Sequence, residues 1–198
     1  MLAGLLEHLA GTDPLVLGIP RGGVVVAAEL AAALHGHLGV LTAVKVRAPR
    51  NPELAVGAVA VDGIPLLDAE LLVRLGVDAA TGDRIVADAV EEVRRRQQAF
   101  GPVPPVAGRV VVVTDDGVAT GSTLRAALAQ VSRGEPQRLV CAVPVGPPET
   151  IAALAASVDE LVCPLQPHWF GAVGEFYEDF TQVSDEEVRG LIAAARRR

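Results

Sequence analysis

An apolar stretch that ends in two acids and a glycine-containing loop constrains this chain most. Residues 110–114 read Val-Val-Val-Val-Thr, and a β-branched run of this kind predicts a buried parallel strand. Asp115 and Asp116 follow directly, and the apolar periodicity of residues 124–131 predicts a helix after the loop. In a sheet of alternating strands and helices, a loop in this position lies where ligands bind.

The loop between this strand and this helix has the composition of a phosphate-binding turn. Its small and hydroxylated residues lead into a helix start, where unpaired backbone N–H groups and the helix dipole favour an anion. Gly121 allows the backbone to approach that anion closely, and the hydroxyls of Thr120, Ser122 and Thr123 add donors. Two acids beside a phosphate would repel it, so they suit the hydroxyls of a sugar or a divalent cation.

The segment from Asp115 to Thr123 resembles the signature of the type I phosphoribosyltransferases, which bind 5-phosphoribosyl-1-pyrophosphate (PRPP). Only Thr114 departs mildly, because it is more polar than the usual residue before the acids. The resemblance implies that Asp115 and Asp116 hold the ribose hydroxyls and contact Mg²⁺ indirectly, through those hydroxyls or water. It assigns the other loop residues to substrate binding, with the 5′-phosphate at the last four: Gly117, Ala119, Thr120, Gly121, Ser122 and Thr123. The alternative is an ordinary strand-to-helix turn with a Thr cap.

Composition and charge narrow the class of protein. The chain has 198 residues, of which 51% are hydrophobic but only 3% aromatic, so the core must consist of Val, Leu, Ala and Ile, as in α/β sheets. A net charge of −7 argues against a general nucleic-acid surface. The longest apolar stretch, residues 24–44, is interrupted by Glu29, His35 and His37, which predicts a helix and a strand instead of a membrane span.

The start of the chain and the two cysteines predict a cytoplasmic protein. Residues 1–8 lack the basic region of a signal peptide. Cys141 and Cys163 lie in apolar, strand-like runs, where two buried free thiols are expected.

Apolar periodicity predicts strands that alternate with helices along the chain. Strands are expected at residues 15–19, 40–46, 110–113, 138–143 and 158–163, a hairpin at 55–67, and helices at 2–9, 24–34, 68–75, 79–100, 124–131, 147–156 and from about 185. This order predicts one α/β domain with a Rossmann-like, mostly parallel sheet flanked by helices. The resemblance implies that this is the type I phosphoribosyltransferase fold. Its core would span residues 12–163, and a small C-terminal hood would span 164–183 with a contribution from 48–67.

A second glycine-containing loop follows the first predicted strand. Residues 20–23 read Pro-Arg-Gly-Gly, and Arg21 offers a fork of donors while Gly22 and Gly23 let the backbone amides turn inward. This loop resembles the pyrophosphate loop of the type I family, although the same four residues also suit an ordinary turn.

Basic residues lie near the end of the next predicted strand. The family has a mobile basic loop at this place, so the resemblance implies that Lys45 and Arg47 bind substrate and that residues 48–53 close over PRPP. Two solvated cations at a sheet edge are the alternative. Together, the loops after Ile19, Val46 and Val113 are expected to meet in one site.

Aromatic residues are concentrated in residues 166–180. In the family a variable hood covers the acceptor base, and Trp169 or Phe170 would stack on its ring. The alternatives are that these rings form the core of the hood itself or an oligomer contact. Asp179 is interpreted as a solvated acid. The arginine cluster at residues 94–96 either reaches the site or forms a solvated face of its helix, and the solvated face is favoured.

Residues 17–23, 51–59 and 170–180 extend the resemblance to a bacterial subfamily of phosphoribosyltransferases with no assigned acceptor. The resemblance implies a Mg²⁺-dependent enzyme of nucleotide metabolism that transfers 5-phosphoribosyl from PRPP to a nitrogenous acceptor and releases pyrophosphate. Asp115, Asp116 and Arg21 would be its catalytic residues, and dimers are common in the family. The alternative is a PRPP- or nucleotide-sensing regulator of the same fold. A dinucleotide enzyme is disfavoured, because no Gly-x-Gly-x-x-Gly turn follows the first strand.

Overall fold

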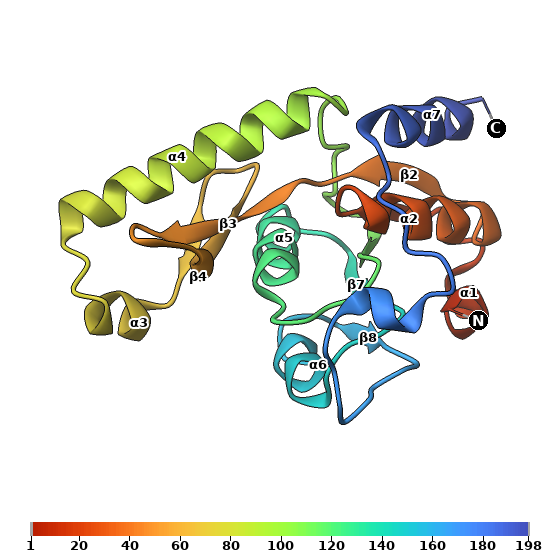
Figure 1. The fold of residues 1–198 in the computed structure, drawn as a ribbon. Helices are drawn as coiled ribbons and strands as arrows, with labels where there is room; N and C mark the ends of the chain where they lie inside the picture. Colours follow the sequence, from red (N-terminus) through yellow and green to blue (C-terminus); the bar gives the residue numbers. More distant parts are fainter. Residues whose placement is uncertain (1, 198) are drawn as a thin grey trace.

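Two β-sheets organise the protein, whose computed structural model describes residues 2–197 (Figure 1). The larger sheet has five parallel strands in the order β2-β1-β6-β7-β8. Their bounds are β1 (Leu15–Gly18), β2 (His37–Val40), β6 (Val110–Thr114), β7 (Arg138–Ala142) and β8 (Glu160–Val162). The predicted α/β fold with a mostly parallel sheet is confirmed.

Helices cover both faces of the parallel sheet because side chains along each strand point alternately to the two sides. Val16 and Val112 pack on the side of α2, whereas Leu17 and Val113 pack on the side of α5. Val188 packs with Val24, so the last helix lies against α2. The helices of this part are α1 (Leu2–Leu5), η1 (Glu7–Leu9), α2 (Gly22–Ala33), α5 (Ser122–Arg133), α6 (Pro148–Ala155) and α7 (Asp185–Ala195).

The second sheet is antiparallel, has the strand order β3-β4-β5, and lies beside α5 (Figure 1). Its strands are β3 (Ala43–Ala48), β4 (Asn51–Ala60) and β5 (Pro65–Leu67), and they are followed by α3 (Ala69–Arg74) and α4 (Ala79–Gln98). Val46 and Val59 bury one face of this sheet against Val93 of α4. Ala58 belongs to the core cluster of α5, so one continuous core joins the two sheets.

The expected single strand at residues 40–46 is wrong. β2 ends at Val40 in the parallel sheet, and β3 begins at Ala43 in the other sheet. The buried side chain of Gln97 stabilises the break, because it accepts a hydrogen bond from Thr42 N–H at 2.8 Å and donates one to the Val40 carbonyl at 3.0 Å. Backbone groups that a neighbouring strand would have satisfied are thus satisfied by a side chain.

Residues 164–183, the expected hood, and residues 48–67, which were expected to contribute to it, lie on opposite sides of α5 (Figure 1). Residues 48–67 belong to the antiparallel sheet, and the turn between β3 and β4 has only two residues, Pro49 and Arg50. The segment expected to close over a ligand, residues 48–53, therefore consists of the ends of β3 and β4 and the turn between them. Residues 164–183 form an irregular segment with one short helix, η2 (Val173–Phe176).

The two cysteines lie at the end of the parallel sheet, Cys141 in β7 and Cys163 directly after β8. Cys141 and Cys163 are free thiols, but only Cys141 is buried, whereas Cys163 is half-buried. Burial raises the pKa of Cys141 to about 12. Among residues 2–197, no helix has the length and apolar character needed to span a membrane.

Candidate active site

The topology places a ligand site beyond the ends of β1 and β6. The chain leaves β1 for its neighbour β2 on one side and returns to its neighbour β6 on the other, and ligands bind where the strand order diverges in this way. The N–H of Ile19 donates a 3.0 Å hydrogen bond to the carbonyl of Thr114 just past the paired residues. Two of the three predicted loops, after Ile19 and after Val113, therefore lie side by side.

Gly22 and Gly23 pack directly against the two acids. A Cβ atom on Gly23 would lie 2.7 Å from Asp115 Cα and 2.8 Å from its carboxylate. A Cβ atom on Gly22 would overlap the carboxylate of Asp116. Only glycine allows the first loop to approach the acids this closely, so the two loops form one surface.

Both loops end at helix starts that have no side-chain cap. The N-cap residues of α2 and α5 are Arg21 and Gly121, and neither makes a side-chain cap hydrogen bond. By contrast, Asp68, Asp78 and Ser184 cap α3, α4 and α7 with their side chains, while α6 follows Pro147, which makes no such bond. Unpaired N–H groups at two neighbouring helix starts favour two anionic groups at this edge of the sheet.

Hydrogen bonds to residues that follow β7 hold the loop before α5. The N–H of Val118 donates to the Val145 carbonyl at 2.9 Å, and the Thr150 hydroxyl donates to the Ala119 carbonyl at 2.8 Å. Gly121 has a φ of 73°, which favours glycine and turns the chain into the helix. The hydroxyls of Thr120 and Ser122 lie 3.3 Å apart, in an arrangement that offers donors beside the helix start.

The two carboxyl groups lie in a poorly solvated position. Burial raises the pKa of Asp115 well above its usual value, and the adjacent charge of Asp116 raises it further. Burial likewise raises the pKa of Asp116. Asp115 Oδ1 accepts a 2.9 Å hydrogen bond from the N–H of Asp116, which fixes its orientation. A cation or a hydroxyl donor would stabilise the charged form of this pair.

These acids fit a magnesium ion that a substrate brings with it. In the described part of the chain, no group of three or more His, Cys, Asp or Glu side chains could enclose a metal. Mg²⁺ in phosphate-binding sites is held by one or two carboxylates together with substrate oxygens and water. Asp115 and Asp116 provide that number of carboxylates.

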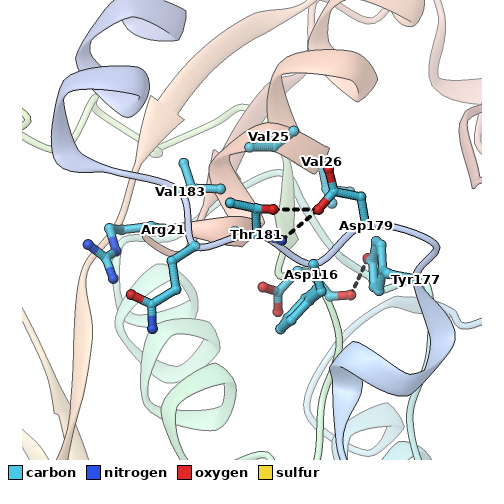
Figure 2. Close-up of a pocket in the computed structure, with 11 residues that line it drawn as sticks. Arg21, Val25, Val26, Asp116, Tyr177, Asp179, Thr181 and Val183 are labelled. Atoms are coloured by element: carbon cyan, nitrogen blue, oxygen red, sulfur yellow. Dashed lines mark hydrogen bonds between the residues drawn. The ribbon is translucent and has the colours of Figure 1, made fainter.

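A cavity of about 300 Å³ adjoins Asp116 (Figure 2). It lies between the first turns of α2 and the segment that leads into α7, and Asp116 lines it. Tyr177 donates a 2.5 Å hydrogen bond to the backbone carbonyl of Asp116, and Asp179 accepts bonds from the N–H and hydroxyl of Thr181. The other lining residues are Arg21, Gly22, Val25, Val26, Phe180, Gln182 and Val183.

Trp169 and Phe170, which were expected to contact an acceptor, do not line this cavity. The Trp169 residue is 93% exposed, and Phe170 stacks on Phe176 with 5.3 Å between ring centroids. The rings of Tyr177 and Phe180 line it instead, with their centroids 5.2 Å apart. The expected aromatic segment thus contributes to the cavity, but through its later members.

Lys45 and Arg47 lie within β3 and not at the end of a parallel strand. Both are exposed, and the Arg47 guanidinium donates to the Pro52 carbonyl at 3.1 Å. Lys45 is paired with Ala58, whose side chain packs in the core cluster of α5, so Lys45 is on the sheet face that points toward α5. The expected meeting of three strand ends is therefore reduced to two.

Sequence reasoning missed several residues that line the cavity. Tyr177 and Phe180 were recognised only as members of an aromatic cluster, and Asp179 was interpreted as a solvated acid. Thr181 and Gln182 had no signal beyond their position after that cluster. Their placement depends on α7. Because α7 packs against α2, the segment that leads into α7 lies beside the first turns of α2 and lines the cavity.

Comparison with known proteins gives consistent matches. The sequence profile of the phosphoribosyl transferase domain matches residues 1–181. Rv0571c of Mycobacterium tuberculosis, provisionally named a phosphoribosyl transferase, is 42% identical over 200 residues. That match covers 99% of this chain but 45% of the relative, so the chain spans less than half the length of that protein. MT0597 from another strain of the species gives the same values.

A solved structure shares the fold along almost the whole chain. The crystal structure of TT1426 from Thermus thermophilus matches with a TM-score of 0.82 and 42% sequence identity. The match covers 98% of this chain and 93% of that chain, so it includes both sheets and the C-terminal helix.

Proposed function

This chain belongs to the phosphoribosyl transferase family, and we propose that it transfers the 5-phosphoribosyl group of PRPP to a nitrogenous acceptor, with release of pyrophosphate. The proposal rests chiefly on one observation: Gly22 and Gly23 lie against Asp115 and Asp116 between two uncapped helix starts. PRPP has an anionic group at each end of a ribose. Two anion-binding helix starts with two acids between them match that order of groups.

Each part of PRPP has a proposed partner. The loop from Thr120 to Thr123 would bind the 5′-phosphate at the start of α5, and Asp115 and Asp116 would accept hydrogen bonds from the ribose hydroxyls. The amides at the start of α2 and the guanidinium of Arg21 would bind the diphosphate. Lys45 and Arg47 remain predicted cation donors from the neighbouring sheet.

The acceptor would enter the cavity beside Asp116. This cavity is lined by two aromatic rings and by three valines, and it also contains polar groups of Asp179, Thr181 and Gln182. Apolar walls with a few polar groups suit a planar heterocycle that stacks on a ring and forms hydrogen bonds at its edge.

The proposed reaction needs positioning and charge stabilisation and no protein nucleophile. A nitrogen lone pair of the acceptor attacks C1 of the ribose while the bond from C1 to the diphosphate oxygen breaks, and the proton of an attacking N–H passes to solvent. Positive charge develops on the ribose ring, where Asp115 and Asp116 stabilise it, and negative charge develops on the leaving diphosphate near Arg21. Mg²⁺, when bound with the diphosphate, would neutralise part of that charge.

The test is titration of the protein with PRPP in Mg²⁺, followed by an acceptor screen for pyrophosphate release. D115N and D116N keep the side-chain shape and remove the charge, so each should lose PRPP affinity while unfolding cooperatively like the parent. Unchanged PRPP affinity and turnover in both variants would overturn the proposal. PRPP binding without release of pyrophosphate in the presence of any tested base would instead indicate a PRPP-sensing regulator of the same fold.

A further inference from the structure

A second cavity, of about 530 Å³, lies on the other side of Arg21. It is formed where the end of α4 meets the starts of α2 and α7, and Figure 1 shows the end of α4 next to α7. Its lining residues are Pro20, Arg21, Thr42, Arg95, Arg96, Phe100 and Asp185. Because Arg21 lines both cavities, the second adjoins the site already described.

The lining of this cavity is strongly basic. It contains three arginines and one acid, Asp185, whose Oδ1 lies 4.0 Å from Nη1 of Arg21. Arg96 forms an ion pair with Glu92 one helical turn away, whereas Arg95 has no ion-pair partner in the part of the chain that the structure describes. Guanidinium groups bind phosphate oxygens in pairs of parallel hydrogen bonds, so three of them around one cavity favour a multiply charged phosphate ligand.

Thr42 provides an independent indication of a ligand. This residue lines the cavity and is only 2% exposed, yet its hydroxyl is the one buried side-chain polar atom without a hydrogen-bond partner among residues 2–197. Gln97 holds its backbone N–H at 2.8 Å, which fixes Thr42 between the two sheets. Buried hydroxyls are normally paired, and a phosphate oxygen bound in the cavity would pair this one.

Arg21 links the basic cavity to the first site. Figure 2 shows its guanidinium turned away from the carboxylate of Asp116, although the Gly22 that follows packs against that carboxylate. An anion that is bound at the start of α2 therefore has Arg21 on the side where Arg95 and Arg96 lie. The unit formed by the antiparallel sheet and α4 would then supply part of the site through the last turns of α4.

We propose that the basic cavity binds a diphosphate group through Arg21, Arg95 and Arg96, with Thr42 as a further donor. For the identity of the ligand this rests on the proposed function, under which the diphosphate belongs to PRPP. Arg95 and Arg96 are then binding residues contributed by α4, in place of the solvated face expected for the arginine cluster.

Three probes separate the parts of the site: inorganic pyrophosphate, PRPP and ribose 5-phosphate, each titrated calorimetrically with Mg²⁺ present. The variant R95Q/R96Q should bind pyrophosphate and PRPP at least about tenfold more weakly, because it loses two charged donors. Its affinity for ribose 5-phosphate, which lacks the diphosphate, should stay within about twofold of the parent. T42V should weaken pyrophosphate binding about fivefold through the loss of one hydroxyl donor.

The matched control is R84Q/R94Q. It removes the same charge from α4 at two positions that do not line the cavity. Equal losses of pyrophosphate affinity in both double variants would attribute the effect to net charge and overturn the proposal.

The remaining outcomes separate this proposal from the proposed function. If the parent binds PRPP and R95Q/R96Q binds it equally well, the proposed role of the basic cavity is overturned and the proposed function stands. Pyrophosphate binding that depends on Arg95 and Arg96, in a protein that binds neither PRPP nor ribose 5-phosphate, supports the cavity and overturns the proposed function.

Discussion

The hydroxyl of Tyr177 donates a 2.5 Å hydrogen bond to the backbone carbonyl of Asp116. This contact joins the segment that leads into α7 to the acidic loop after β6, although 61 positions separate the two residues. Burial raises the pKa of Tyr177 to about 12, and the charges of Asp116 and Asp115 act in the same direction. The phenol therefore stays protonated, and it remains a donor, throughout the range in which the protein would be assayed.

Tyr177→Phe removes this donor and keeps the ring that packs with Phe180. We expect a loss of about 1 kcal/mol in the free energy of unfolding, which is typical of one hydrogen bond. The larger effect should be local, with faster amide exchange in residues 173–183 and a raised KM for the acceptor. PRPP affinity should change little, because the Asp116 side chain keeps its position. Unaltered exchange in residues 173–183 would show that the bond does not hold the segment.

Gly23→Ala places a methyl group 2.7 Å from Asp115 Cα, a backbone atom that cannot move away cheaply. We expect a cost of about 2 kcal/mol, as for other overpacked sites, together with loss of PRPP binding as the loops separate. Gly82→Ala in α4 is the control, since its Cβ meets no atom within 4 Å. That change should stabilise the helix by up to about 1 kcal/mol, as measured by urea unfolding. Equal stabilities for the two variants would contradict the close packing of the loops.

The strand, acids and helix from residue 110 to 133 were predictable because each has a local signal: a β-branched run, a glycine turn and apolar periodicity. The break at Thr42 was not, since residues 40–46 are uniformly apolar apart from Thr42 and Lys45. Two strands that belong to different sheets look like one strand in such a run. The deciding contact comes from Gln97, which is more than fifty positions away.

The same limit applies to the candidate site. Asp115, Arg21 and the glycines follow strands directly, so topology alone placed them at one edge of the sheet. Tyr177 reaches the site through a long irregular segment, and Arg95 lines the adjoining basic cavity because α4 packs across the second sheet. A sequence pattern shows which face of a helix is apolar, but it does not show which element packs against that face.

Gln97 is a buried polar residue whose side chain is fully used. It accepts from Thr42 N–H and donates to the carbonyls of Val40 and Gly101, the latter at 2.8 Å. Gln97→Leu keeps a similar volume but leaves these backbone groups unpaired, and we expect a loss of about 3 kcal/mol. The exposed Gln98 provides the control, because Gln98→Ala should change stability by less than about 0.5 kcal/mol. A similar urea midpoint for both variants would mean that water replaces the lost bonds.

Asp115→Asn should stabilise the protein at neutral pH while it removes PRPP binding. Burial raises the pKa of Asp115, so between the usual range of aspartate and that raised pKa the folded protein holds more protons than the unfolded chain. Stability therefore falls as the pH rises through this window, and the Asn variant, which also relieves the repulsion of Asp116, escapes this loss. We expect a gain of about 1 kcal/mol at neutral pH that disappears near pH 4.

Urea unfolding at a series of pH values measures this effect, with Asp83→Asn on the exposed face of α4 as the control. The control should keep the pH slope of the parent. A gain for D115N that does not vary with pH would exclude the buried charge as its cause. A loss of stability at neutral pH would show that the Asp115 carboxylate is compensated in the free protein. The proposed arrangement requires the opposite, a pair of acids whose charge is stabilised only when the sugar hydroxyls and the accompanying cation arrive.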